Sequence, residues 1–281
     1  MRGFVRGSIR AAWLVIVGLA TSAAVAQTSE LYLTDFNSSA LWVVQGGQIV
    51  RQFDRSSIQD GPSCAVLGTI RCVGQDGGST GHEYSLVGAP LAGSYLNPSF
   101  DSLYDAATDG ARYWSIAHND GATNYALVEA DSSWGGIHVL FSPANRSSGV
   151  TWDAVSSSLW ITNTMGTATA VQQVNLSGTV LSSFPVSIPG GYSIAWDPAD
   201  DTLWIPGSGT GTLYQYSKAG VQLQVVTVPG LTGYIVGAEF GGAAAPRGAT
   251  VVPTLGGGAL AAFALAMAAA GAFAVKGTLR G

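Results

Sequence analysis

Charged residues are scarce in this chain, and histidine and cysteine are scarcer still. Lys, Arg, Asp and Glu make up 10% of the 281 residues, against about 25% in a typical soluble protein. All 17 acidic residues but only seven of the 12 basic residues lie between positions 27 and 251, so this segment carries a net charge of −10. Such a surface repels phosphate backbones and anionic membranes, which excludes nucleic-acid binding.

The few residues able to carry chemistry do not form a recognisable catalytic motif. The three histidines, His82, His118 and His138, are too far apart in sequence to form a local metal site. No nucleophile elbow, zinc-protease motif or phosphate-binding loop is present. We therefore predict no catalytic residue, no metal and no cofactor, and the sequence favours a protein without enzymatic activity over an enzyme.

The two cysteines, Cys64 and Cys72, are separated by seven residues. An even cysteine count in an exported chain predicts a disulfide. This one would close a short loop and stabilise the fold by about 2–3 kcal/mol through the entropy of the unfolded chain.

The N-terminus has the three parts of a secretory signal peptide. Arg2, Arg6 and Arg10 form a basic region, an apolar stretch covers residues 11–24, and Ala24-Val25-Ala26 is a small-x-small cleavage site. We expect residues 1–26 to be removed and the chain to be exported. The alternative is an uncleaved N-terminal anchor, for which the apolar run is short.

The C-terminal segment, residues 252–281, is a second targeting signal. Val252-Pro253-Thr254-Leu255 precedes an apolar run that continues without a charge to residue 275, about the length of a membrane-spanning helix. This arrangement resembles the IPTL-CTERM signal, a relative of the PEP-CTERM signals of Gram-negative bacteria. The resemblance implies that an exosortase-type transpeptidase is a partner, with a transient anchor in the inner membrane and final sorting to the cell surface. The alternative is a plain C-terminal anchor that is not processed.

Two segments of the region between these signals repeat each other. Trp152 and Trp196 are 44 residues apart, as are Trp160 and Trp204, and each segment contains four short β-type stretches separated by turns. A period of 40–45 residues with several short strands per unit is typical of a β-propeller blade. The recurring Asp153 and Asp197 are expected to be turn residues. The fold class predicted is therefore all-β, a single propeller followed by a transmembrane helix.

The number of blades follows from the two ends of the repeat region. Residues 31–50 match the second, third and fourth strands of a blade, and residues 234–240 match a first strand. One blade shared by the two ends would close the ring and leave no unpaired inner strand. With blades at 56–97, 101–144, 148–188 and 192–229, the total is five. Because residues 56–97 match the repeat poorly, four blades with a long insertion is the alternative.

The domain organisation predicted is a signal peptide at 1–26, a propeller at 27–242, a linker at 243–251 and the sorting segment at 252–281. The polar loop His118-Asn119-Asp120 and the residue Trp134 are candidates for a ligand rim, alongside a purely structural role as turn and core residues. The function predicted is a non-enzymatic binding or matrix protein whose ligand is an extracellular glycan or protein. The alternative is a secreted hydrolase or lyase, which requires His118, Glu83 and aspartates to converge at the central channel.

Overall fold

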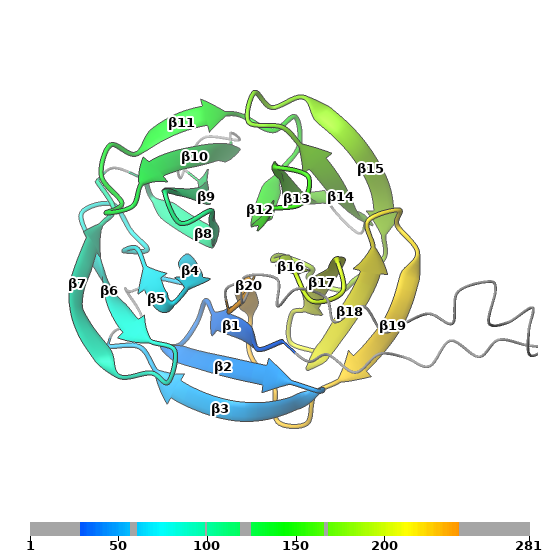
Figure 1. Ribbon diagram of the computed structural model, residues 1–281, viewed down its shortest axis with the longest axis horizontal. Helices are drawn as coiled ribbons and strands as arrows, with labels where there is room; N and C mark the ends of the chain where they lie inside the picture. The colour runs from blue at the N-terminus through cyan, green and yellow to red at the C-terminus, as the bar shows by residue number, and fades with distance from the viewer. Residues whose placement is uncertain (1–28, 57–60, 99, 119–124, 166–167, 242–281) are drawn as a thin grey trace, which may run out of the picture. The chain divides into compact units, whose positions relative to one another are not determined.

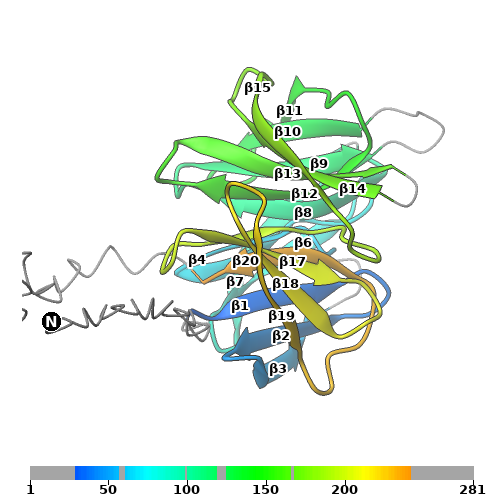
Figure 2. The same ribbon diagram turned by 90° about the vertical axis from the view of Figure 1, so that its right-hand side faces the viewer.

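Short apolar stretches alternate with glycine- and aspartate-containing turns along the chain, and each stretch forms a strand in the computed structural model. The structure describes residues 29–241 apart from 57–60, 99, 119–124 and 166–167. Its strands form five four-stranded antiparallel sheets arranged in a ring (Figure 1). Figure 2 shows the same ring from its edge, where the twist of the sheets is visible. The fold is therefore a five-bladed β-propeller, as the repeat and its two ends predict, and the four-blade alternative is wrong.

Each blade is named here by its place in the chain, and its strands are given from the inside of the ring outward. Blade 1 contains β20 (Ile235–Phe240), β1 (Leu31–Asp35), β2 (Ala40–Gln45) and β3 (Gln48–Asp54). Blade 2 contains β4 (Cys64–Leu67), β5 (Thr69–Cys72), β6 (Thr80–Ser85) and β7 (Pro90–Leu96). Blade 3 contains β8 (Ser102–Thr108), β9 (Arg112–His118), β10 (Tyr125–Asp131) and β11 (His138–Phe141).

The last two blades correspond to the clearest sequence repeat. Blade 4 contains β12 (Ser147–Asp153), β13 (Ser158–Met165), β14 (Ala168–Val174) and β15 (Val180–Val186). Blade 5 contains β16 (Ala195–Asp197), β17 (Thr202–Gly207), β18 (Thr212–Ser217) and β19 (Gln222–Thr227).

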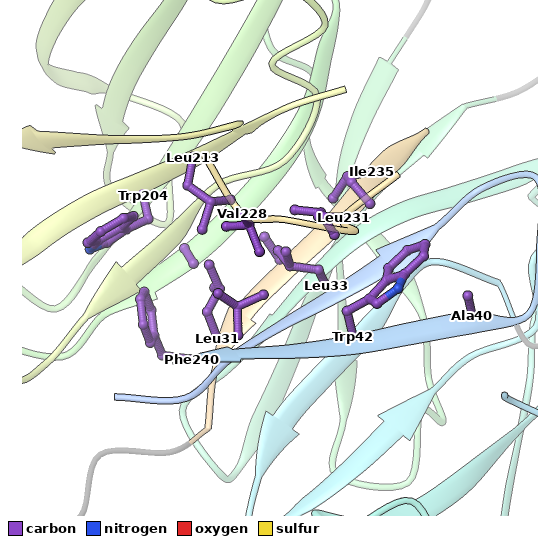
Figure 3. Packing of buried hydrophobic residues seen from close by; sticks show 13 residues of the cluster. Leu31, Leu33, Ala40, Trp42, Trp204, Leu213, Val228, Leu231, Ile235 and Phe240 are labelled. Atoms are coloured by element: carbon purple, nitrogen blue, oxygen red, sulfur yellow. The ribbon is translucent and has the colours of Figure 1, made fainter. Parts of the chain in front are cut away.

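Blade 1 closes the ring by joining the two ends of the described chain. β20 pairs antiparallel with β1, with Leu31 opposite Phe240 and Thr34 opposite Gly237. Apolar side chains from blade 1, blade 5 and the connection between them pack together at this junction (Figure 3). Trp204 of blade 5 lies edge-on to Phe240, with ring centroids 6.5 Å apart. The joint is therefore held by the ladder of one sheet and by a core between two sheets.

Blade 2 lacks the tryptophan-aspartate pattern but is a complete blade. Its two inner strands form a hairpin in which Cys64 and Cys72 are directly opposite each other and are joined by the predicted disulfide. Both cysteines are buried. The cross-link fixes the register of strands that are only four residues long.

The repeated tryptophans and aspartates are architectural. Trp114, Trp160 and Trp204 occupy the second strand of blades 3, 4 and 5 and are fully buried. Asp153 accepts hydrogen bonds from the backbone N–H groups of the turn that follows it and from the Trp160 indole, at 3.2 Å. It thereby fixes the turn between the first and second strands of blade 4, as the sequence predicts.

The two faces of the ring are distinguished by strand direction. We call the face where the inner strands begin the upper face and the face where they end the lower face. Because β1 starts opposite the end of β20, the described chain enters and leaves the ring at the lower face. No helix among the described residues is long and apolar enough to span a membrane. The signal peptide, the linker, the motif Val252-Pro253-Thr254-Leu255 and the predicted transmembrane helix lie outside the described residues.

Candidate ligand-binding face

A buried carboxylate, Asp105, occupies the centre of the ring. The register between β8 and β9 shifts between Leu103 and Ala106, a bulge that redirects the side chains of the extra residues. Asp105 is fully buried there and accepts four backbone N–H hydrogen bonds. The donors and distances are Ala106 (3.1 Å) and Ala238 (2.8 Å) to Oδ1, and Val150 (3.2 Å) and Ile194 (3.1 Å) to Oδ2.

These four donors belong to the inner edges of blades 3, 1, 4 and 5. The remaining blade, blade 2, is linked through Ser63, whose hydroxyl lies 2.8 Å from that of Ser115 and 3.4 Å from the Asp105 backbone carbonyl oxygen. The Asp105 side chain thus connects the inner edges of four blades, and its backbone carbonyl oxygen connects the remaining one. Burial raises the pKa of the Asp105 carboxyl well above its usual range, and the four N–H groups oppose that shift.

A second buried acid, Glu239, lies in the same channel. Its Oε2 accepts a hydrogen bond from the Thr151 hydroxyl at 3.1 Å, and the same hydroxyl accepts the backbone N–H of Trp196. Burial and the negative charge of Asp105 raise the pKa of Glu239 well above its usual range. Both acids are buried among the inner strands, and their hydrogen bonds join these strands to one another.

The upper face carries a continuous row of aromatic side chains, which we call the aromatic arc. Successive ring centroids along the arc lie 4.7–6.4 Å apart. In spatial order its members are Tyr192, Tyr234, Phe36, Tyr104, His118 and Tyr125. All except Tyr125 are partly exposed. A row of half-exposed rings is a surface on which an amphipathic ligand can stack.

The fold brings these rings together because each lies at the upper end of a strand. Phe36 directly follows β1, and Tyr104 lies in the bulge of β8 beside Asp105. Tyr192 and Tyr234 lie in the connections that lead into the inner strands of blades 5 and 1. The same bulge that places a carboxylate in the channel therefore places an aromatic ring at its mouth.

A cleft of about 470 Å³ adjoins the Tyr192–Tyr234 end of the arc. Its lining combines these two rings with backbone and small polar groups: Asn37, Pro189, Gly190, Ser208, Gly209 and Gly233. Burial and the neighbouring Tyr192 and Tyr104 hydroxyls raise the pKa of Tyr234, which keeps its hydroxyl neutral as a hydrogen-bond donor. An apolar lining with a few placed polar groups is typical of a small-molecule or glycan pocket.

Arg146 supplies positive charge at the opposite end of the arc. Its guanidinium lies over the Tyr125 ring, 5.1 Å from the centroid, and its charge also acts on Tyr234. Arg146 is exposed, in the connection that leads into β12. The upper face therefore carries aromatic rings for stacking, hydroxyl groups for hydrogen bonding and one cation, and these groups can bind a ligand.

The residues that the sequence proposed for a rim are separated by the structure. His118 lies in the aromatic arc, stacked on Tyr125 at 4.7 Å. Asn119 and Asp120 lie outside the described residues. Trp134 does not lie on this face: it is 3% exposed, at the lower end of blade 3, and packs against Tyr113 at 5.0 Å.

The burial of Trp134 has a local cause. Asp131 accepts hydrogen bonds from the backbone N–H groups of Ser133 and Gly135, which curls the loop, and Trp134 has a positive φ of 57°. The indole is thereby directed into the core between blades 2 and 3. It is not available to stack on a sugar.

The convergence required by the hydrolase or lyase alternative is not observed. Glu83 lies in β6 of blade 2, where it accepts hydrogen bonds from Thr69, Arg71 and Tyr95. His118 instead contacts rings of blade 3. The described residues contain no cluster of three or more His, Cys, Asp or Glu side chains able to hold a metal ion.

Comparisons with known proteins identify the fold and leave the family open. No family model matches the chain, and no curated protein matches it. Among solved structures, it is similar to a propeller chain in a nidogen–laminin complex, with 13% identity, a TM-score of 0.53, and coverage of 75% of this chain and 81% of that chain.

Two further structures are more distant. Regucalcin from Agrobacterium tumefaciens, described as a calcium-binding protein, has 12% identity and a TM-score of 0.43, over 74% of this chain and 77% of that one. Virginiamycin B lyase from Staphylococcus aureus has 14% identity and a TM-score of 0.36, over 73% of this chain and 57% of that one. The similarity to the chain of the nidogen–laminin complex, at 13% identity, establishes a shared fold only.

Proposed function

We propose that this chain is an exported, cell-surface propeller that binds an extracellular ligand on its upper face without transforming it. The observation that carries the proposal is the aromatic arc with its adjoining cleft. Binding surfaces are distinguished by half-exposed aromatic side chains around a hollow, and the arc meets this description. The propeller of the nidogen–laminin complex is part of a protein–protein assembly, which is consistent with a propeller serving as a platform.

The proposed route to the surface uses the two terminal segments. Export would depend on residues 1–26, and the segment from Val252 to Gly281 would anchor the chain before an exosortase-type transpeptidase processes it. The test is cell fractionation of the natural chain and of a variant with Val252-Pro253-Thr254-Leu255 replaced by four alanines. Processing predicts a smaller surface form that disappears in the variant. If the natural chain and the variant both give a single membrane-bound form, the C-terminal segment is a plain anchor that is not processed.

The binding proposal is tested with the full-length chain in detergent, on arrays of bacterial surface glycans and matrix proteins. A double variant, Tyr192→Ala with Tyr234→Ala, removes one end of the arc and should abolish binding. Phe53→Ala is the matched control, because Phe53 is a partly exposed aromatic on the outer strand β3 that packs on Tyr84. Equal binding by the double variant would refute the arc as the site. Release of a cleaved or isomerised glycan during the assay would instead favour the hydrolase or lyase.

A further inference from the structure

The described cations other than Arg146 are all occupied by partners within the propeller. Arg51, Arg71, Arg112 and Lys218 each form an ion pair with a carboxylate. Arg55 is buried and donates to the backbone carbonyl oxygens of Asp35 and Ser38. Each of these side chains thus has a carboxylate or carbonyl oxygen of the propeller as its hydrogen-bond or ion-pair acceptor.

Arg146 differs from these residues. Within the described part of the chain, its guanidinium makes no ion pair and no side-chain hydrogen bond, and its contact is the face of Tyr125. A guanidinium stacked on a ring is held in one plane while its N–H groups stay available at the edge. Such a group binds a carboxylate through two parallel hydrogen bonds.

The surroundings of Arg146 indicate what carries that carboxylate. The arc presents partly exposed aromatic rings and phenol hydroxyls, and the cleft adds the Asn37 amide and the Ser208 hydroxyl. Ring faces match the C–H surface of a pyranose, and the hydroxyl and amide groups match its hydroxyls. An extended acidic peptide would instead use an unpaired strand edge. The unpaired edges near the arc belong to the inner strands, which face the channel and donate the N–H groups of Val150, Ile194 and Ala238 to Asp105.

We infer that the aromatic arc binds an acidic polysaccharide, with Arg146 binding a uronate carboxylate and the Tyr192–Tyr234 end stacking on another sugar of the same polysaccharide. This inference rests on the proposed function and specifies its ligand. The net charge of −10 between residues 27 and 251 repels a polyanion, as it repels nucleic acid, so the binding has to come from the local contacts of Arg146 and the rings and not from general attraction.

The test is isothermal titration of the full-length chain in detergent with three probes: oligogalacturonate, neutral dextran oligosaccharide and oligoglutamate. Arg146→Gln removes the charge, and Arg146→Lys keeps the charge without the planar fork. Arg51→Gln changes the net charge equally at a residue bonded to Glu30 near the lower face. We expect oligogalacturonate to bind the natural chain at 0.15 M salt, and Arg146→Gln to weaken it about tenfold or more.

The control Arg51→Gln should bind like the natural chain, and Arg146→Lys should fall between. If dextran binds the natural chain and Arg146→Gln equally well and oligogalacturonate does not bind, the acidic ligand is overturned. The proposed binding function would remain intact. Preference for oligoglutamate would replace the polysaccharide with an acidic peptide. If Arg51→Gln and Arg146→Gln weaken oligogalacturonate binding equally, the binding depends on net charge and not on a contact with Arg146, which would also overturn the inference.

Discussion

The central carboxylate of Asp105 gives the most direct test of how the ring is held together. Replacing Asp105 with Asn keeps the shape of the side chain but presents an NH2 group to two of the four backbone N–H donors. Each buried donor left without an acceptor costs about 1–3 kcal/mol, so Asp105→Asn should destabilise the fold by about 2–6 kcal/mol. Asp105→Ala removes the acceptor from all four donors and should cost about 4 kcal/mol or more, a large share of the 5–15 kcal/mol typical of a folded domain.

The assay is guanidinium unfolding followed by tryptophan fluorescence, for which the buried Trp114, Trp160 and Trp204 are internal reporters. Asp76→Asn is the control, because Asp76 is exposed in a turn of blade 2 and its substitution should change stability by less than about 0.5 kcal/mol. A cost below about 1 kcal/mol for Asp105→Asn would refute the reasoning. Equal costs for the Asn and Ala variants would show that the carboxylate does not serve the four blades together.

Three other substitutions address the channel, the cross-link and the close approach of two blades. The pKa of Glu239 is raised above its ordinary 4.5, so its contribution to stability is fully present below that pH and is lost as pH rises through the folded-state pKa. Glu239→Gln does not titrate. Above about pH 4.5 this variant should therefore gain stability relative to the natural chain, by at most about 1.4 kcal/mol per pH unit. Cys64→Ala with Cys72→Ala should lower the free energy of unfolding by about 2–3 kcal/mol in denaturant titrations. Gly237→Ala should cost about 1–3 kcal/mol in thermal unfolding, because the added methyl would overlap the Pro62 carbonyl oxygen.

Each of these outcomes can fail in a distinct way. If the free energies of unfolding of Glu239→Gln and of the natural chain differ by a constant amount between pH 4 and 8, Glu239 titrates normally. Unchanged stability after removal of both cysteines would mean that the β4–β5 hairpin is fixed by packing alone. A neutral Gly237→Ala would mean that blades 1 and 2 can separate at the upper face without cost.

The sequence predicts the blades because their pattern is local and repeated. Trp160 and Trp204 mark the same position in two blades, and residues 31–50 and 234–240 are complementary parts of a third. The disulfide is predicted because only two cysteines exist. These features depend on spacing along the chain, which is what a single sequence displays.

The binding face could not be predicted in the same way. Its rings come from positions as far apart as Phe36 and Tyr234, and they meet only because the ring closes. Asp105 reaches the channel through a bulge that the alternation of apolar residues does not reveal. One local signal was available: Tyr192 and Tyr234 both lie just before an inner strand, and this recurrence places them on the same face.

Trp134 is a residue for which the sequence left both a rim role and a core role open, and the structure shows the core role. A tryptophan in a glycine-rich loop resembles an exposed binding residue, but burial depends on the neighbouring blade, whose contact with Tyr113 and Trp134 is tertiary. Loop composition alone therefore does not distinguish a rim residue from a core residue.

Closure by β20 also sets the order in which the protein can be completed. The first strand made, β1, has no inner neighbour until the chain has been extended to Phe240, because that neighbour is the last strand of the ring. Until then β1 presents an unpaired edge, and Asp105 lacks the N–H of Ala238. The ring is thus finished only when nearly all of the described chain has emerged, so we expect premature termination before β20, which begins at Ile235, to leave an open sheet edge rather than a smaller propeller.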